Sequence, residues 1–277
     1  IIIFNFVSNL NSMRYIATLS YCGKALSGWQ KQHNATTVQG ELERALGILA
    51  SAPVETVGAG RTDAGVNAVN YVCHFDLPEP FPMAKPDLLH KINAILRKDI
   101  VIHDITPEKS FESLADTPRP IHARFSARER TYRYFIHRAK DPFIENLSWR
   151  CVWPLDMDKM NRACGFLLGE HDFSCFEKVG GNNKTSICTV RKAGWERWTP
   201  SHIGMTGYPD DGHYMVFTIS ADRFLRNMVR AIVGTMVDVG RGRIEPEEVA
   251  EIIRRGKRSE AGESVPGFAL FLSKVEY

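Results

Sequence analysis

One aspartate inside a glycine-rich loop is the residue with the clearest capacity for chemistry. The loop reads Gly-Ala-Gly-Arg-Thr-Asp-Ala-Gly-Val from Gly58 to Val66, and Asp63 follows Arg61 by two residues. It does not fit a phosphate-binding loop, because no Gly-Lys-Ser/Thr ends it and a carboxylate stands where a dinucleotide fingerprint needs glycine. Asp63 is then either an aspartate that only closes its own turn or a reactive acid held beside a guanidinium.

A basic and aromatic segment spans residues 119–140. Seven Lys or Arg residues and one acid give it a charge of +6, whereas the whole chain carries +3. On a strand, Arg130, Tyr132 and Tyr134 would share one face. RNA recognition combines basic side chains that bind phosphates with aromatic rings that stack on an unpaired base, and this segment contains both. The alternative is a strand whose basic residues are solvated and whose aromatic residues belong to the core. The basic residues are Arg119, Arg124, Arg128, Arg130, Arg133, Arg138 and Lys140.

Three further arginines, Arg223, Arg226 and Arg230, fall in an amphipathic helix predicted over 222–239. Arg226 and Arg230 are four residues apart and would share a face, which costs roughly a few tenths of a kcal/mol for unpaired like charges. Such a face is expected to meet an anion or a carboxylate, above all at Arg230, whose neighbours are apolar. The alternative is a set of solvated surface arginines.

The sequence predicts no protein-bound metal. The six cysteines form no Cys-x-x-Cys pair and the nine histidines no His-Glu-x-x-His motif, so we expect free thiols. Ser174 follows His171 and Asp172 without a nucleophile-elbow motif, so a hydrolase triad is not expected. No apolar run suits a membrane span and residues 1–12 lack the features of a secretory signal, which predicts a cytoplasmic protein.

The elements that position these residues follow the order β-α-β-β-α-β twice. We therefore predict an α+β fold of two ferredoxin-like split β-α-β halves with a central catalytic cleft. An extension over 1–12 without assigned function precedes an N-terminal domain over 13–118 and a C-terminal domain over 119–277. The expected strands are 14–21, 54–57, 69–76, 100–105, 127–138, 185–198, 213–220 and 267–275. The expected helices are 38–50, 86–96, 156–168, 222–239 and 246–255.

Motifs along the chain from Met13 resemble the bacterial tRNA pseudouridine synthase A family. They are Ser27-Gly28-Trp29-Gln30-x-Gln32, Thr37-Val38-Gln39, the loop from Gly58 to Val66, Ala123-Arg124-Phe125-Ser126-Ala127, Arg130-x-Tyr132-x-Tyr134, His171-Asp172-Phe173 and Phe224-Leu225-x-x-Met228-Val229-Arg230-x-Ile232-Val233-Gly234. The resemblance implies a cofactor-free isomerase that converts uridine to pseudouridine at positions 38, 39 and 40 in the anticodon stem-loop of tRNA. It also implies a homodimer with one tRNA lying across both subunits.

The resemblance implies roles for five side chains. Asp63 matches the catalytic aspartate, and Tyr132 matches the tyrosine that stacks on the target base. Arg230 matches the arginine that pairs with the aspartate, and Arg61 the loop arginine that positions the RNA. Leu270 matches the apolar residue that lines the uracil pocket.

Two more arginines, Arg124 and Arg128, are expected to contact tRNA phosphates because they lie in the basic segment. The chain departs from the family pattern at three places, none of which includes Asp63, Tyr132 or Arg230. The departures are Tyr21-Cys22-Gly23 for Tyr-Asp-Gly, Gly65-Val66-Asn67-Ala68 for Gly-Val-His-Ala and Ala269-Leu270-Phe271-Leu272 for Gly-Leu-x-Leu.

Two other functions compete with the synthase. A non-catalytic RNA-binding module would explain the basic and aromatic segment but not the acid inside a cationic loop. A small-molecule enzyme would use Asp63 but leave that segment without a purpose. Isomerisation needs no redox partner or net water, only a carboxylate. The sequence leaves open whether Asp63 would attack the base, attack the sugar or mainly steer the detached base.

Overall fold

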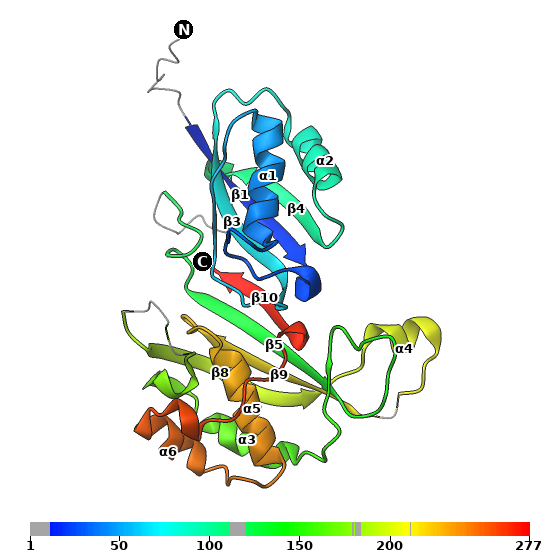
Figure 1. Ribbon diagram of the computed structural model, residues 1–277, viewed down its shortest axis with the longest axis vertical. Coiled ribbons are helices and arrows are strands. Elements are labelled where there is room, and N and C mark those ends of the chain that lie inside the picture. The colour runs from blue at the N-terminus through cyan, green and yellow to red at the C-terminus, as the bar shows by residue number, and fades with distance from the viewer. Residues whose placement is uncertain (1–11, 111–119, 179, 181–183, 211) are drawn as a thin grey trace.

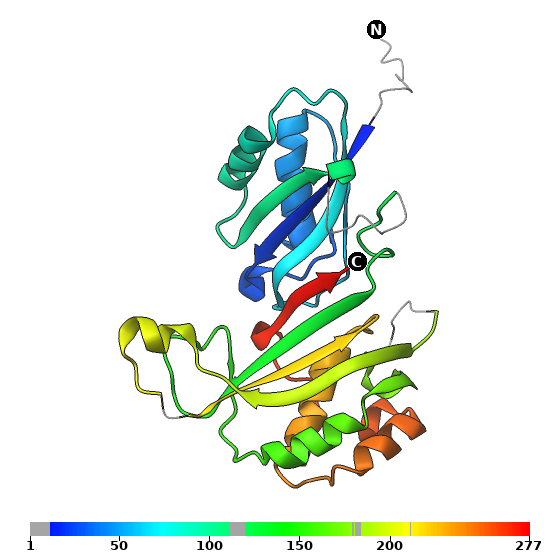
Figure 2. The ribbon, with the colours of Figure 1, turned by 180° about the vertical axis from the view of Figure 1, so that it is seen from behind.

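One mixed β-sheet runs through the whole molecule. The structure is a computed structural model of the 277-residue chain that describes residues 12–110, 120–178, 180, 184–210 and 212–277. Its ten strands follow the order β4-β1-β3-β10-β5-β9-β8-β7, with β2 beside β3 and β6 beside β5. Helices α1, α2 and α5 lie in front of the strands in Figure 1, and the view from behind in Figure 2 brings the strands forward. The predicted α+β class is confirmed.

The N-terminal half supplies three long strands, one short strand and two α-helices. Thr37 caps the first helix, because its side chain accepts the Gly40 N–H at 3.2 Å. The elements are β1 (Ser12–Tyr21), α1 (Val38–Ala50), β2 (Thr56–Gly58), β3 (Asn67–Pro78), α2 (Lys85–Ile95) and β4 (Ile100–Pro107).

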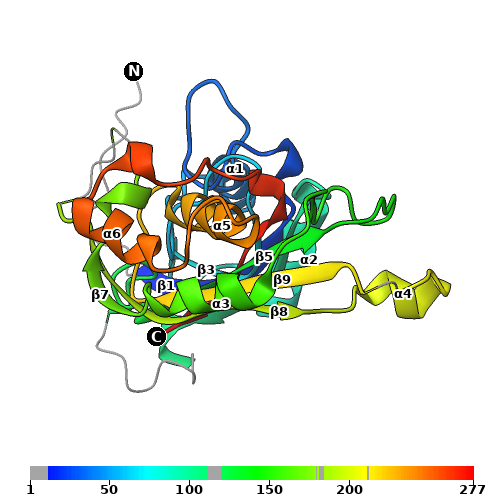
Figure 3. The same cartoon turned by 90° about the horizontal axis from the view of Figure 1, so that it is seen from below.

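The C-terminal half contains the longer series of elements. Three of them, β6, β7 and α4, were not predicted, because runs of two, four and six residues are too short to show a period. Figure 3 shows α4 standing out from the body beyond the ends of β8 and β9. The elements are β5 (Glu129–His137), β6 (Trp149–Arg150), α3 (Met157–Gly165), β7 (Gly169–Asp172), β8 (Ile187–Arg197), α4 (Ser201–Thr206), β9 (Tyr214–Ala221), α5 (Met228–Gly240), α6 (Glu248–Arg255) and β10 (Leu270–Glu276).

Helix α5 begins six residues later than predicted. Asn227 precedes it with a φ of 66°, a left-handed conformation that cannot continue a helix upstream. Arg223 and Arg226 therefore lie before the helix, and the prediction that they accompany Arg230 on it is wrong. The helix is buried almost all round instead of amphipathic, and of its 13 residues only Arg230 and Asp238 are not buried.

Strand β10 joins the two halves. It runs parallel to β3, with Phe271 opposite Asn67, and antiparallel to β5, with Leu270 opposite Tyr134. The sheet is therefore continuous where the chain passes from one half to the other (Figure 1). Within the described residues, we find no helix with both the length and the apolar character needed to cross a bilayer.

Candidate active site

The loop that carries Asp63 links β2 to β3 and is held as a rigid turn. The Val66 N–H donates to the Asp63 carbonyl at 3.2 Å, and the Trp29 N–H donates to the Thr62 carbonyl at 3.3 Å. Gly28, with a φ of 87°, lies so close that a Cβ there would stand 2.2 Å from the Thr62 oxygen. Glycine is needed at this position both for the left-handed backbone and for the close approach of the loop.

Asp63 and Arg230 meet across the junction of the two halves. Nη1 of Arg230 lies 3.7 Å from Oδ2 of Asp63, and the side chains are 22% and 26% exposed, respectively. The other side of the guanidinium is fixed, because its Nε donates to the Val265 carbonyl at 2.7 Å. The arginine from the buried helix and the acid from the loop thus form an ion pair that is partly open to solvent.

Tyr132 lies on β5 with its ring buried. Phe224 packs edge-on against it, at 5.1 Å between ring centroids and 87° between planes. Burial raises the pKa of the Tyr132 hydroxyl, and the negative charge of nearby Asp63 raises it further. The phenol is therefore neutral at neutral pH.

Leu270 opens β10 and is buried at 5% exposure, opposite Tyr134 on β5. The segment before it is tied to the same strand, because the Tyr134 hydroxyl donates to the Pro266 carbonyl at 3.0 Å. Val265, which holds Arg230, lies one residue earlier. The 265–270 segment therefore links the arginine, the central strand and the apolar leucine.

Asn67, one of the departures from the family pattern, connects three segments of this site. Its Oδ1 accepts the Gly23 N–H at 2.8 Å, and its Nδ2 donates to the Phe268 carbonyl at 2.6 Å. The side chain is 1% exposed, so it acts as a buried link between the segments that carry Gly23 and Phe268. An asparagine that replaces a histidine was visible in the sequence, but its two partners were not.

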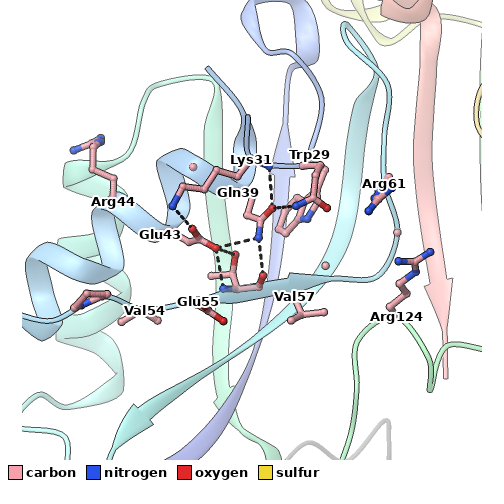
Figure 4. A pocket seen from close by; sticks show the side chains of 16 residues that line it. Trp29, Lys31, Gln39, Glu43, Arg44, Val54, Glu55, Val57, Arg61 and Arg124 are labelled. Carbon is pink, nitrogen blue, oxygen red and sulfur yellow. Dashed lines mark hydrogen bonds and ion pairs between the residues drawn. The ribbon is translucent and has the colours of Figure 1, made fainter. Parts of the chain in front are cut away.

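Arg61 and Arg124 line a hollow of about 820 Å³ between α1, β2 and the loop. Figure 4 shows their side chains on the same side of it, away from the network of Lys31, Gln39 and Glu43. Both arginines are exposed. Asp63 is not among the residues that line this hollow, so the guanidinium groups occupy the approach to the loop and not the ion pair itself.

The basic segment does not present all its arginines to solvent. Arg130 shares a face with Tyr132, but that face points inward, and its guanidinium donates to the carbonyls of Ala127, Asp222 and Ala59 at 2.8, 2.7 and 3.0 Å. Arg130 is thus a structural cation, whereas Arg128 is exposed. Arg119 lies outside the described residues.

Metal-ligand clusters and cysteine thiols are the other features that could support chemistry. Among the residues that the structure describes, no three His, Cys, Asp or Glu side chains group closely enough to hold a metal ion. All six cysteines are free, as expected, and five of them are buried. Burial raises the pKa of the Cys151 thiol to about 11, so this group is protonated at neutral pH.

Sequence comparison assigns the chain to a family. The profile of tRNA pseudouridine synthase matches residues 163–277. The chain is 44% identical over 267 residues to the tRNA pseudouridine synthase A of Parabacteroides distasonis, across 95% of this chain and 96% of that protein. The protein of the same name from Porphyromonas gingivalis is 43% identical, across 95% of this chain and 97% of that protein. The one from Bacteroides fragilis is 40% identical, across 97% of this chain and 98% of that protein. With the loop, the ion pair and the buried tyrosine in place, the chain belongs to the tRNA pseudouridine synthase A family.

Proposed function

We propose that this protein converts uridine to pseudouridine at positions 38, 39 and 40 in the anticodon stem-loop of tRNA, with Asp63 as the catalytic carboxylate. Family membership makes the chain a pseudouridine synthase, an isomerase that acts on tRNA uridine. The aspartate is supported by one observation above all: Asp63 sits in a fixed turn with the Arg230 guanidinium 3.7 Å away.

The chemistry suits that arrangement. The bond from C1′ to N1 of uracil breaks, the base turns, a bond from C1′ to C5 forms, and the proton lost from C5 is balanced by one gained at N1. A carboxylate can begin this sequence as a nucleophile, and a guanidinium beside it can orient it. In our proposal Tyr132 stacks on the uracil and Leu270 supplies an apolar wall. No cofactor and no metal enters the balance.

The target uridine must leave the RNA stack to reach a carboxylate in a turn. Arg61, Arg124 and Arg128 are exposed and are proposed to contact the phosphates that flank it. A non-catalytic RNA-binding module would account for these arginines. It would not account for an acid placed among them and paired with an arginine from a buried helix.

We further propose two ferredoxin-like halves, over 13–118 and 119–277, around a central cleft. The strand order β4-β1-β3, with β2 beside β3, and the order β10-β5-β9-β8 support this division. We propose a cytoplasmic homodimer, in keeping with the free thiols. The apolar side chains of Phe143 and Met205, 58% and 82% exposed, are candidate contacts for a second subunit.

Tritium release tests the proposal directly. A tRNA transcript with tritium at C5 of its uridines releases the label only when C5 becomes the glycosidic carbon. Stem-loop RNAs that carry a single labelled uridine at position 38, 39 or 40 then separate the three targets. We expect release from each by the wild-type protein and none by Asp63→Asn. Binding without release by the wild type would favour the RNA-binding module, and release only at other positions would refute the anticodon assignment.

A further inference from the structure

We infer that Phe125, stacked on His122, is a platform for an unpaired RNA base that flanks the target uridine. This inference rests on the proposed function and adds a second base-binding position to it. Phe125 is 76% exposed, the highest value among the exposed large aromatic side chains of the described residues. A ring this open to water gains free energy when a base covers it.

Two neighbouring side chains lie close to the ring. The ring stacks on His122 at 4.3 Å between centroids and 27° between planes. The Arg124 guanidinium lies 5.7 Å from the ring centroid. One face of Phe125 is thus covered by an imidazole and a cation lies beside the ring, which suits a base whose phosphate carries negative charge.

The turn that carries the ring is fixed by two imidazoles. Nδ1 of His122 accepts the N–H groups of both Arg124 and Phe125 at 3.2 Å. Nδ1 of His74, a residue on β3, accepts the Ala123 N–H at 3.1 Å. Because binding to a rigid group costs less conformational entropy, a ring held in this way binds a base better than a mobile one.

Both imidazoles must be neutral at Nδ1 to accept these bonds. Burial lowers the pKa of His74 to about 4, and the nearby charge of Arg14 lowers it further while Asp76 opposes the shift. Burial also lowers the pKa of His122, as does Arg14. Both shifts favour the neutral imidazoles that these hydrogen bonds require.

The platform adjoins the catalytic loop through two contacts. The Arg130 guanidinium donates to the carbonyls of both Arg124 and Ala59, and Ala59 lies in the loop that carries Asp63. Arg124 also lines the same hollow as Arg61 (Figure 4). A phosphate held between Arg61 and Arg124 would place its nucleotide beside Phe125 and outside the pocket of the target base.

Fluorescence of 2-aminopurine tests the platform. The probe is an anticodon stem-loop RNA with 2-aminopurine at one unpaired loop position, moved through the loop in a series. Stacking quenches this base. We expect binding to quench it at one position beside the target, Phe125→Tyr to keep the quenching, and Phe125→Leu to abolish it and weaken binding about 5- to 150-fold. A fully paired hairpin of equal length is the control and should bind both variants alike.

A second pair of variants tests the role of His122 in positioning Phe125. Asparagine can accept the two N–H groups as Nδ1 does, whereas alanine cannot. We expect His122→Asn to retain more of the quenching than His122→Ala, with equal affinity of both for the paired hairpin. Equal quenching in the two variants would refute the positioning role.

The outcomes separate this inference from the proposed function. If Phe125→Leu quenches and binds as the wild type does while tritium release proceeds, the platform is wrong and the synthase stands. If the wild-type protein neither binds nor modifies the stem-loop, both fall. If Phe125→Leu also loses affinity for the fully paired hairpin, Phe125 serves general RNA contact or folding, and the platform is again wrong.

Discussion

Arg230 holds Asp63 with one edge of its guanidinium and the backbone of Val265 with another. The Nη1 to Oδ2 distance is 3.7 Å and the Nε to carbonyl distance is 2.7 Å. A planar fork can meet both partners at once, whereas a lysine ammonium is a single point on a flexible stem. The acid of the loop is therefore aligned by a group that is itself fixed to the segment before β10.

Replacing Asp63 by asparagine should abolish turnover and preserve binding. Asparagine is nearly isosteric and the turn is closed by backbone bonds, so the loop should remain folded. Pseudouridine formed in a single turnover should fall to background, while tRNA affinity changes by no more than about tenfold, or roughly 1.4 kcal/mol. Normal binding with turnover within tenfold of the wild type would make Asp63 a structural turn residue.

Replacing Arg230 should separate alignment from stability. Arg230→Lys should lower single-turnover rates at least about tenfold, because lysine cannot serve both partners. Arg230→Ala should also lower the free energy of unfolding by about 1–3 kcal/mol, since it leaves the Val265 carbonyl without its donor. Arg243→Lys is the matched control, because Arg243 also pairs with an aspartate, Asp238, but its own side chain is 58% exposed, so the pair should contribute little. Similar losses in Arg230→Lys and the control would contradict the alignment.

Tyr132 should act through its ring. Its hydroxyl is buried with a raised pKa and is not poised to transfer a proton at neutral pH. Tyr132→Phe should therefore retain more activity than Tyr132→Leu, which loses the about 1–3 kcal/mol that base stacking provides. Activity is measured as single-turnover pseudouridine formation at equal RNA occupancy. Near-total loss in both variants would point to the hydroxyl instead.

The arginines of the basic segment should divide into two kinds. Arg124→Ala and Arg128→Ala should weaken tRNA binding and flatten the slope of log K against log salt by somewhat less than one unit each, since each phosphate contact contributes about 0.7 to 0.9. Arg130→Ala should instead lower the melting temperature, because it removes the donors from four backbone carbonyls. Unchanged slopes for both exposed arginines, or an Arg130→Ala protein as stable as the wild type, would contradict this division.

Stability should fall as the pH drops from about 6.5 toward 4, in part because of His74. Its pKa is lowered from 6.5 in the unfolded chain to about 4 in the fold, so only the unfolded state takes up its proton in that window. This linkage contributes on the order of 2–3 kcal/mol at pH 7, which is lost by about pH 4. Denaturant unfolding across pH should show a shallower decline for His74→Asn than for the wild type. Parallel curves would show that other groups set the acid limit.

The periodicity of apolar residues predicted most of the strands and helices, but not which of their faces points to the interior. Apolar residues recur at regular spacing along strands such as Glu129–His137 and helices such as Val38–Ala50, and this spacing predicts the elements. The break at Asn227 was hidden, because Phe224 and Leu225 continue an apolar spacing that the backbone does not follow. Alternation placed Arg130 on the same face as Tyr132, yet could not show that this face is internal, because the carbonyls that receive Arg130 come from distant segments.

The place of β10 in the sheet has a consequence for synthesis on the ribosome. Its partners β3 and β5 are made long before it, and the bond from Asn67 to the Phe268 carbonyl spans 201 residues. The first half can pack its own core as it emerges from the ribosome. The edge of β3 that pairs with β10 stays unpaired with that strand until nearly the whole chain has been translated. Arg230 is fixed by Val265, which emerges just ahead of β10, so Asp63 gains its aligned partner at about the same late moment. A nascent chain can thus be well packed in its first half and still lack a complete reaction centre.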